Sequence, residues 1–230
     1  MVGIDLGCGS LKKEGFIGID FVEASGVDFF MDMEKEPLPF DSQSVDHVFS
    51  SHFLEHIENH PFVFNQISRV CKDGAKVELW LPYLWSNAGF VFGHKFFFSE
   101  EIFLHLCLKH YTYWIDILGA RWFLKEIVFV IAPSTLADLN AVGMPLSFAI
   151  KHFPNVVEEM GIFIDVAHDS NLPPCIPSYS FSFGRNLERF PLRNTSKGIR
   201  YKINFALGAI REMGFSNFLR FISKTLRAKS

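Results

Sequence analysis

The chain has 230 residues, of which 49% are hydrophobic and 20% charged, with a net charge of −3, so we expect one sizeable core in a single α/β domain with appendages. It has no basic start followed by an apolar signal core, and its uncharged stretch at 79–93 is interrupted by proline and glycine and is too short to span a bilayer. The four cysteines form no Cys-x-x-Cys pair, which argues against a zinc site or a disulfide framework and favours a cytoplasmic protein.

Short apolar runs bounded by glycine or charge predict four strands near the start of the chain, at residues 2–6, 16–20, 27–32 and 44–50. A helix is predicted over 53–71, because apolar residues recur there at helical intervals, and Gly74 is expected to cap it in a left-handed conformation. A fifth strand over 75–81 ends at Pro82. Strands that alternate with helical segments favour βαβ units and a mostly parallel sheet.

The middle of the chain predicts one more helix and a hairpin. Ser99 is a suitable N-cap for a helix to about residue 109, since two glutamates follow it in the first turn. Residues 111–117 and 126–132 are predicted as two strands that turn near Gly119. This hairpin would complete a seven-stranded sheet.

The last part of the chain has a weaker pattern. Residues 135–160 have helical character, interrupted by Pro145 and Pro154, and residues 170–184 are rich in proline and serine and are expected to form a loop or linker. Residues 185–230 hold 11 of the 22 Lys+Arg but only two acids, a net charge of +9 against −12 for the remainder. This asymmetry suits either an anionic partner or a tail that docks on its own acidic domain.

The most informative motif is the glycine turn Gly7-Cys8-Gly9 after the first strand. Alone it also suits a tight turn between two core strands with no ligand. A dinucleotide site would need a third glycine and a full helix, whereas Lys12 stands at the third position and only ten residues separate Gly9 from Asp20. The turn therefore favours a nucleoside cofactor that has no phosphate to bind.

Polar side chains at the ends of the next strands support this interpretation. The carboxyl ends of parallel strands meet at one edge of a sheet, so Asp20, Asp32 and the segment 50–52 would converge on one crevice. The carboxylate of Asp20 can accept from both ribose hydroxyls, and Asp32 with the Met33 backbone can receive an adenine edge. S-adenosylmethionine meets that description.

Six short motifs follow one another within the first 56 residues: Ile4-Asp-Leu-Gly-Cys-Gly9, Gly18-Ile-Asp20, Asp32-Met33, Pro37-Leu-Pro-Phe40, Ser44-Val-Asp46 and Phe53-Leu-Glu-His56. Together they resemble the class I S-adenosylmethionine-dependent methyltransferases, and among these the small type-11-like group. The resemblance covers residues 1–82 well, extends loosely to residue 132 and hardly includes the last hundred residues. It implies a Rossmann-like three-layer α/β sandwich with a C-terminal helical extension.

The resemblance also implies the cofactor S-adenosyl-L-methionine and its site. The residues that it assigns to cofactor binding are Asp5, Gly7, Cys8, Gly9, Asp20, Phe21, Asp32, Met33 and Ser51. The glycine turn would lie against the methionine part with Asp5 bracing it, the ribose would lie at Asp20, and the amino group near Ser51. The chain departs from the wider family in its very short link between the first two strands and in lacking a helix before the first strand.

Two histidines are candidates for catalysis. Methyl transfer mainly needs proximity and alignment, and a hydroxyl acceptor also benefits from a general base, most often histidine. His94 and His52 are expected to overlook the crevice, and His94 is preferred because His-x-x-x-Phe-Ser segments recur at this point in related methyltransferases. Glu55 and His56, adjacent on a helix, would point about 100° apart and are not expected to face the site together. The histidines show no recognisable ligand spacing, so we expect no metal.

Acceptor contacts are predicted at two places. Tyr83 and Trp85 follow the strand-breaking Pro82 and are the aromatic residues most expected to face the acceptor. From residue 216 on, apolar and basic residues occupy opposite helical arcs, which suits contact of 216–230 with the inner face of a membrane, packing on the acidic domain, or a partner subunit. Nucleic acid is disfavoured, because the main domain is acidic and the tail resembles no RNA-binding module.

These observations predict three regions: a methyltransferase core at 1–133, a helical and loop insertion or cap at 134–184, and a basic amphipathic helical tail at 185–230. The expected function is S-adenosylmethionine-dependent O-methylation of a small molecule or glycan. Two alternatives stay open: methylation of a lipid-linked or natural-product acceptor at the membrane surface, and a cofactor-binding scaffold without turnover.

Overall fold

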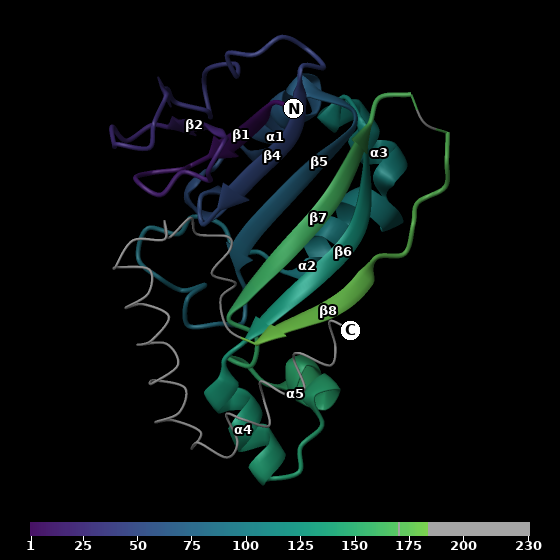
Figure 1. Cartoon of the computed structure of the whole chain (residues 1–230). Helices are drawn as coiled ribbons and strands as arrows, with labels where there is room; N and C mark the ends of the chain where they lie inside the picture. The colour runs from purple at the N-terminus through teal and green to yellow at the C-terminus, as the bar shows by residue number, and fades with distance from the viewer. Residues whose placement is uncertain (170, 184–230) are drawn as a thin grey trace.

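The computed structural model describes residues 1–169 and 171–183 (Figure 1). The basic tail predicted at 185–230, with its membrane-contacting segment 216–230, lies outside the described residues. No helix in the described part of the chain has both the length and the apolar character needed to cross a membrane.

An eight-stranded sheet forms the centre of the molecule, in the order β3-β2-β1-β4-β5-β7-β6-β8 (Figure 1). Neighbouring strands are parallel except for β7, which runs antiparallel to both β5 and β6. The strands are β1 Gly3–Leu6, β2 Ile17–Asp20, β3 Phe29–Phe30, β4 Val45–Ser51, β5 Cys71–Pro82, β6 Arg121–Ile131, β7 Glu159–Ala167 and β8 Ser178–Phe183. The predicted α/β class with a mostly parallel sheet is confirmed, with eight strands instead of seven.

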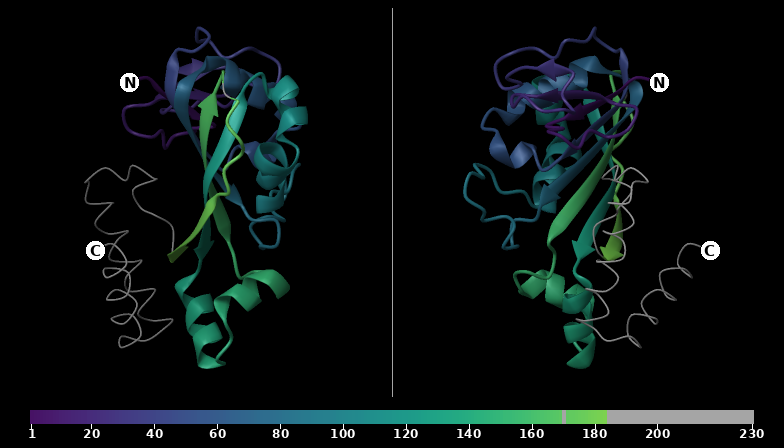
Figure 2. Two further views of the ribbon diagram at one scale, coloured as in Figure 1. Left: turned by 90° about the vertical axis from the view of Figure 1, so that its right-hand side faces the viewer. Right: turned by 60° about the vertical axis from the view of Figure 1, so that its left-hand side comes forward.

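Helices accompany the sheet on one face and at one end. They are α1 His60–Val70, α2 Glu100–Leu104, α3 Tyr111–Leu118, α4 Pro133–Ala141 and α5 Leu146–His152, together with a 3₁₀ turn, η1 Leu54–His56, and a π-helical turn, η2 His105–Lys109. Helices α2 and α3 pack beside the sheet, whereas α4 and α5 project from the end where β6 stops and β7 starts (Figure 2).

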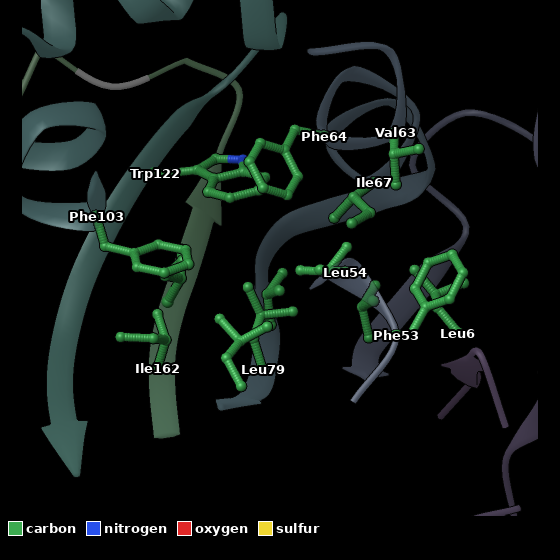
Figure 3. Packing of buried hydrophobic residues seen from close by; sticks show 14 of the residues in the cluster. Leu6, Phe53, Leu54, Val63, Phe64, Ile67, Leu79, Phe103, Trp122 and Ile162 are labelled. Atoms are coloured by element: carbon green, nitrogen blue, oxygen red, sulfur yellow. The ribbon is translucent and has the colours of Figure 1, made fainter. Parts of the chain in front are cut away.

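The main core lies between the sheet and the helices. Phe64 of α1 packs on Trp122 of β6 with ring centroids 5.3 Å apart, and Leu79 of β5 lies nearby (Figure 3). The indole nitrogen of Trp122 donates to Ser68 Oγ at 2.8 Å, so this buried polar group is satisfied. A smaller apolar cluster, which includes Trp80, occupies the alternate strand positions and therefore the opposite face of the sheet.

The predicted helix over 53–71 is divided in the structure. Asn59 caps α1 by accepting from Phe62 N, and Pro61 occupies the first turn, where its missing N–H costs nothing. Residues 54–56 form the separate turn η1. Gly74 has the expected positive φ of 78°, but it lies within β5 and is not the cap of α1, whose cap is Cys71.

The prediction of a hairpin strand at 111–117 is wrong, because the segment is helix α3. Its sequence is mostly apolar, with Asp116 as its one charged residue, a pattern that a short strand and a packed helix share, and the helix contacts α1. Gly119, expected at a hairpin turn, caps α3 in the left-handed conformation with φ 74°. The helix predicted to start after Ser99 is confirmed, although the Ser99 side chain makes no capping bond.

Two strands were not predicted from the sequence. Residues 135–160 contain the expected interrupted helices α4 and α5, but β7 begins at Glu159, and β8 lies within the segment 170–184 expected to be a loop. The sequence predicts a boundary at residue 133 between the methyltransferase core and the following insertion. Strand β7 comes after that boundary but lies between β5 and β6, so the sheet includes residues from both predicted regions. The third predicted strand, 27–32, is reduced to the two residues of β3.

Candidate functional site

The site lies where the strand order reverses. Strand β1 pairs with β2 on one side and with β4 on the other, and the chain runs outward from β1 to β2 and β3 before it crosses back to β4. Such a switch point leaves a crevice beyond the strand ends, where open α/β sheets bind their ligands. The glycine turn after β1, Asp20 at the end of β2 and Ser51 at the end of β4 all lie there.

The glycine turn is held by the strands beside it. Gly7 has φ 72°, and a Cβ built on it would lie 2.3 Å from Phe53 Cβ, so only glycine fits. Gly7 N donates to Ile19 O at 2.8 Å, and Gly9 N donates to Asp20 Oδ2 at 2.9 Å. Because these amides already have acceptors, the turn is not built as a phosphate cradle.

A pocket of about 280 Å³, here called the turn pocket, opens beside the glycine turn. It is lined by Asp5, Gly7, Cys8, Gly9, Ser10, Leu11, Phe49, Ser51 and His52. Five of the nine predicted cofactor residues and one predicted catalytic histidine are therefore brought together. Ser51 Oγ is buried and makes no hydrogen bond to any residue that the structure describes, so it offers a donor and an acceptor to a ligand.

Asp5 is a buried carboxyl group in the wall of the turn pocket. Its Oδ2 accepts from Lys13 N at 2.7 Å, which ties the segment after the glycine turn to β1. Burial raises the pKa of Asp5 to about 7, although the Lys13 amide and ammonium oppose the rise. A positively charged ligand group in the pocket would favour the carboxylate form.

Asp20 does not line the turn pocket directly but borders it through Gly9. Its Oδ2 accepts from Gly9 N and its Oδ1 from Val22 N, each at 2.9 Å. A carboxylate oxygen has two lone pairs, so each oxygen keeps one for a ribose hydroxyl. The geometry is compatible with the predicted ribose contact.

The predicted adenine residues lie outside the turn pocket. Met33 is buried in the core, and Asp32 accepts from Glu34 N at 3.0 Å and from Lys35 Nζ at 2.7 Å. Phe21, directly after Asp20, is 58% exposed. These three residues lie past the ends of β2 and β3, at the same edge of the sheet.

Cys8 packs beneath the turn and is no nucleophile. Its Sγ donates to Gly26 O at 3.5 Å, and burial, together with the nearby Asp5 and Asp20, raises the pKa of the thiol to about 12. The thiolate that nucleophilic chemistry requires is therefore disfavoured.

His52 stands at the end of β4 in a strained backbone conformation, with φ 54°. Its Nε2 donates to Glu159 Oε1 at 2.9 Å, and its Nδ1 lies 3.3 Å from Glu55 Oε1. Burial lowers the pKa of His52, but the two carboxylates outweigh burial and raise it to about 9.

A second pocket, of about 220 Å³ and here called the loop pocket, shares His52 with the turn pocket. It is lined by His52, Ser86, Asn87, Ala88, Asn155, Glu158 and Glu159. Sequence reasoning missed the last three residues because they precede or begin a strand, β7, that was not recognised. The sequence signal that could have identified them is the acidic pair at 158–159, which follows the turn-forming Pro154 and Asn155 after two valines.

The other predicted acceptor and catalytic residues lie elsewhere. His94, preferred from the sequence, lines neither pocket, and its Nδ1 donates to Gly89 O at 2.9 Å. Tyr83 is buried and its hydroxyl donates to Glu100 at 2.9 Å, contrary to the expectation that it would face the acceptor. Trp85 is 57% exposed, next to the loop pocket residue Ser86.

Comparisons with known proteins identify a similar domain and a similar fold. A family model described as a methyltransferase domain matches residues 4–79. A SAM-dependent methyltransferase structure from Archaeoglobus fulgidus is 18% identical over 71% of this chain and 85% of its own, with a TM-score of 0.52. One from Methanosarcina mazei is 14% identical over 73% and 92%, with a TM-score of 0.44. No curated protein matches the chain.

The family match and the site describe the same part of the molecule. Residues 4–79 contain the glycine turn, Asp20 and Ser51, and the Archaeoglobus structure has the same kind of fold. The turn pocket also offers an orphaned hydroxyl at Ser51 and a buried carboxyl at Asp5 to a cofactor. Residues 4–79 therefore match a methyltransferase domain, and the chain has the fold of an S-adenosylmethionine-dependent methyltransferase, which implies S-adenosylmethionine as the cofactor.

Proposed function

We propose that the protein methylates a hydroxyl oxygen of a small molecule or glycan bound in the loop pocket. The observation that carries the proposal is that His52 forms part of the wall of both pockets, so a cofactor in one would meet an acceptor in the other. The loop pocket is lined mainly by amides and carboxylates, which suit an acceptor rich in hydroxyl groups.

The chain's own residues align the acceptor and receive its proton. S-adenosylmethionine supplies a sulfonium-bound methyl group, whose transfer to oxygen leaves the sulfur with the bonding electron pair. Glu159 is placed to accept the proton that the hydroxyl loses, and His52 Nε2, 2.9 Å from Glu159 Oε1, holds that carboxylate toward the pocket. Asn155 and Glu158 would orient the neighbouring hydroxyls of the acceptor.

A kinetic experiment separates the two pockets. Purified protein is incubated with S-adenosylmethionine and a panel of sugars, nucleotide sugars and hydroxylated small molecules, and release of S-adenosylhomocysteine is measured. Glu158→Gln should raise the acceptor KM by about tenfold, as expected for the loss of one charged hydrogen bond, and leave the cofactor Kd unchanged. An unchanged acceptor KM, or equal losses for both ligands, contradicts the assignment of the loop pocket.

The scaffold alternative is tested by the same preparation. Calorimetric binding of S-adenosylmethionine without methyl transfer to any member of the panel or to a cell extract would favour a non-catalytic protein. Turnover with any acceptor removes that alternative.

One observation favours a lipid-linked acceptor as the second candidate. The segment that lines the loop pocket continues into a run of exposed apolar residues, with Trp85 57%, Phe90 63% and Phe92 103% exposed. Such a run beside an acceptor pocket suits an amphiphilic acceptor at a membrane surface. If this candidate is right, Phe90→Ser/Phe92→Ser should reduce co-sedimentation with anionic liposomes and activity on a lipid-linked sugar, but not activity on the free sugar. Equal activity of the variant on both acceptors contradicts it.

A further inference from the structure

A second group of chemically active side chains lies outside both pockets. Glu55 and His56 belong to η1, and His94 belongs to the segment 84–98 after β5. One ligand atom of each of the three residues lies within 4.8 Å of the other two. We propose that Glu55, His56 and His94 form a binding site for a divalent transition-metal ion of the zinc type.

Both histidines are held in the form that binds a metal. His56 Nδ1 lies 3.2 Å from Gly93 O, and His94 Nδ1 lies 2.9 Å from Gly89 O. A carbonyl oxygen can only accept, so Nδ1 of each ring is the donor and Nε2 is the nitrogen left for a ligand. Metal-binding histidines characteristically donate their other ring nitrogen in this way, which fixes the tautomer and the ring orientation.

Glu55 supplies the independent observation. Its side chain is fully buried, at 0% exposure, and neither carboxylate oxygen accepts a hydrogen bond from any residue that the structure describes. His52 Nδ1 lies 3.3 Å from Oε1, at ion-pair distance, whereas Oε2 has no hydrogen-bond donor among the described residues. A buried carboxylate without donors is costly, and a cation coordinated by Oε2 would remove the cost.

The backbone explains why adjacent residues can face one ion. Residues 54–56 form a single 3₁₀ turn and not the α-helix on which a divergence of about 100° was expected. Lys95 N and Phe96 N both donate to Glu55 O, at 2.8 and 3.2 Å, so the segment that carries His94 is fastened onto η1. The three ligands therefore come from two segments that the backbone already joins.

The donor set indicates the kind of metal. Two imidazole nitrogens and one carboxylate oxygen are the ligands of open zinc sites, in which a water or substrate completes the tetrahedron. Ligand atoms in such a site are about 3.4 Å apart, so the side chains would approach one another by up to about 1.4 Å on binding. The ion would join η1 to the segment 84–98, and this segment supplies Ser86, Asn87 and Ala88 to the loop pocket.

The proposal is tested by titration with the metal alone. The full chain, without an affinity tag and stripped with a chelator, is titrated calorimetrically with ZnCl₂ and, separately, followed by the visible ligand-field absorption of bound Co²⁺. One ion per chain should bind, with tetrahedral Co²⁺ bands. Glu55→Gln, His56→Ala and His94→Ala should each weaken binding at least tenfold, as expected when one of three ligands is removed.

A matched variant checks that the effect is specific. His105 and His110 form a second histidine pair, with ring centroids 4.3 Å apart, and neither belongs to the proposed cluster. His110→Ala should bind Zn²⁺ like the unchanged protein. Because His56 is exposed, His56→Ala should fold normally. This variant therefore still tests the site if the buried Glu55→Gln variant does not fold. Failure of the unchanged protein to bind, or equal binding by His56→Ala and His94→Ala, overturns the proposal.

Discussion

The two pockets beside His52 are built in different ways. The turn pocket is formed by strand ends and a glycine turn whose amides are bonded to neighbouring strands. The loop pocket depends on irregular segments that are tied together by two bonds, from Asn155 N to Trp85 O and from Asn87 N to Asn155 Oδ1, both 2.6 Å. The family match ends at residue 79 and includes only His52 of the loop pocket. The turn pocket, here called the donor side, thus belongs to the part of the chain that the family model matches. The loop pocket, here called the acceptor side, is built largely from segments outside that match.

The largest effect is expected from Gly7→Ala in the turn pocket. The new Cβ would lie 2.3 Å from Phe53 Cβ, and alanine would have to adopt the positive φ of this position. The free energy of unfolding should therefore fall by about 3–5 kcal/mol. Gly15→Ala is the matched control, because it has φ 79° but open space around its Cβ, and it should lose only about 1–2 kcal/mol. Urea denaturation measures both variants, and equal losses would contradict the role of Phe53.

Asp5→Asn should change stability in a pH-dependent way. The folded protein favours protonated Asp5, since its pKa rises from 3.8 to about 7, so the wild type loses stability as the pH rises through this window. Above pH 7 the asparagine variant should be more stable by up to about 4 kcal/mol, and below about pH 4 the two proteins should be equally stable. Thermal denaturation across the pH range measures the difference, and parallel curves would contradict the prediction.

Asp20→Ala tests the ribose contact at the rim of the turn pocket. Loss of a charged acceptor should weaken S-adenosylmethionine binding by about 1.5–3 kcal/mol, which corresponds to roughly 10–150-fold in Kd by calorimetry. Asp46→Ala is the control, because Asp46 also accepts from a backbone amide, Val2 N at 2.6 Å, but lies away from the pocket. A weakened cofactor Kd in both variants would indicate a general loss of stability.

The smallest effect is expected on the loop pocket side. Asn155 has φ 61°, so Asn155→Gly keeps the backbone conformation and removes the side chain's bond to Asn87 N together with its proposed contact to the acceptor. Acceptor KM should rise by about fivefold, or about 1 kcal/mol, while cofactor Kd stays constant. Asn155→Ala adds backbone strain and should have a larger effect on KM. If the glycine variant changes cofactor Kd, the two pockets are not built independently.

The donor side could be predicted from sequence because its signals are local. The glycine turn, Asp20 and Ser51 each follow or end the apolar strand that positions them. Because the carboxyl ends of parallel strands meet at one edge of a sheet, these residues are predicted to lie together. The acceptor side could not be predicted in this way. Glu158 and Glu159 reach His52 only because β7 pairs with β5, a contact between segments about 80 residues apart that no local pattern encodes.

The errors in the helices and strands have the same origin. Residues 111–118 are apolar enough to form either a buried strand or a packed helix. The helix forms because it packs against α1, a contact that the local sequence does not reveal. The preference for His94 over His52 rested on a motif, whereas position in the wall of a pocket depends on the path of the segment 84–98, which the sequence pattern does not show.

The late position of β7 in the chain also bears on how the protein is made. Strand β5 ends at residue 82 and β6 at residue 131, but the strand that lies between them is complete only at residue 167. During synthesis the edges of β5 and β6 that pair with β7 therefore stay unpaired for a time on the order of ten seconds at ribosomal rates. Unpaired edges favour association with other chains, so a nascent chain halted before residue 159 should be a strong client for chaperones.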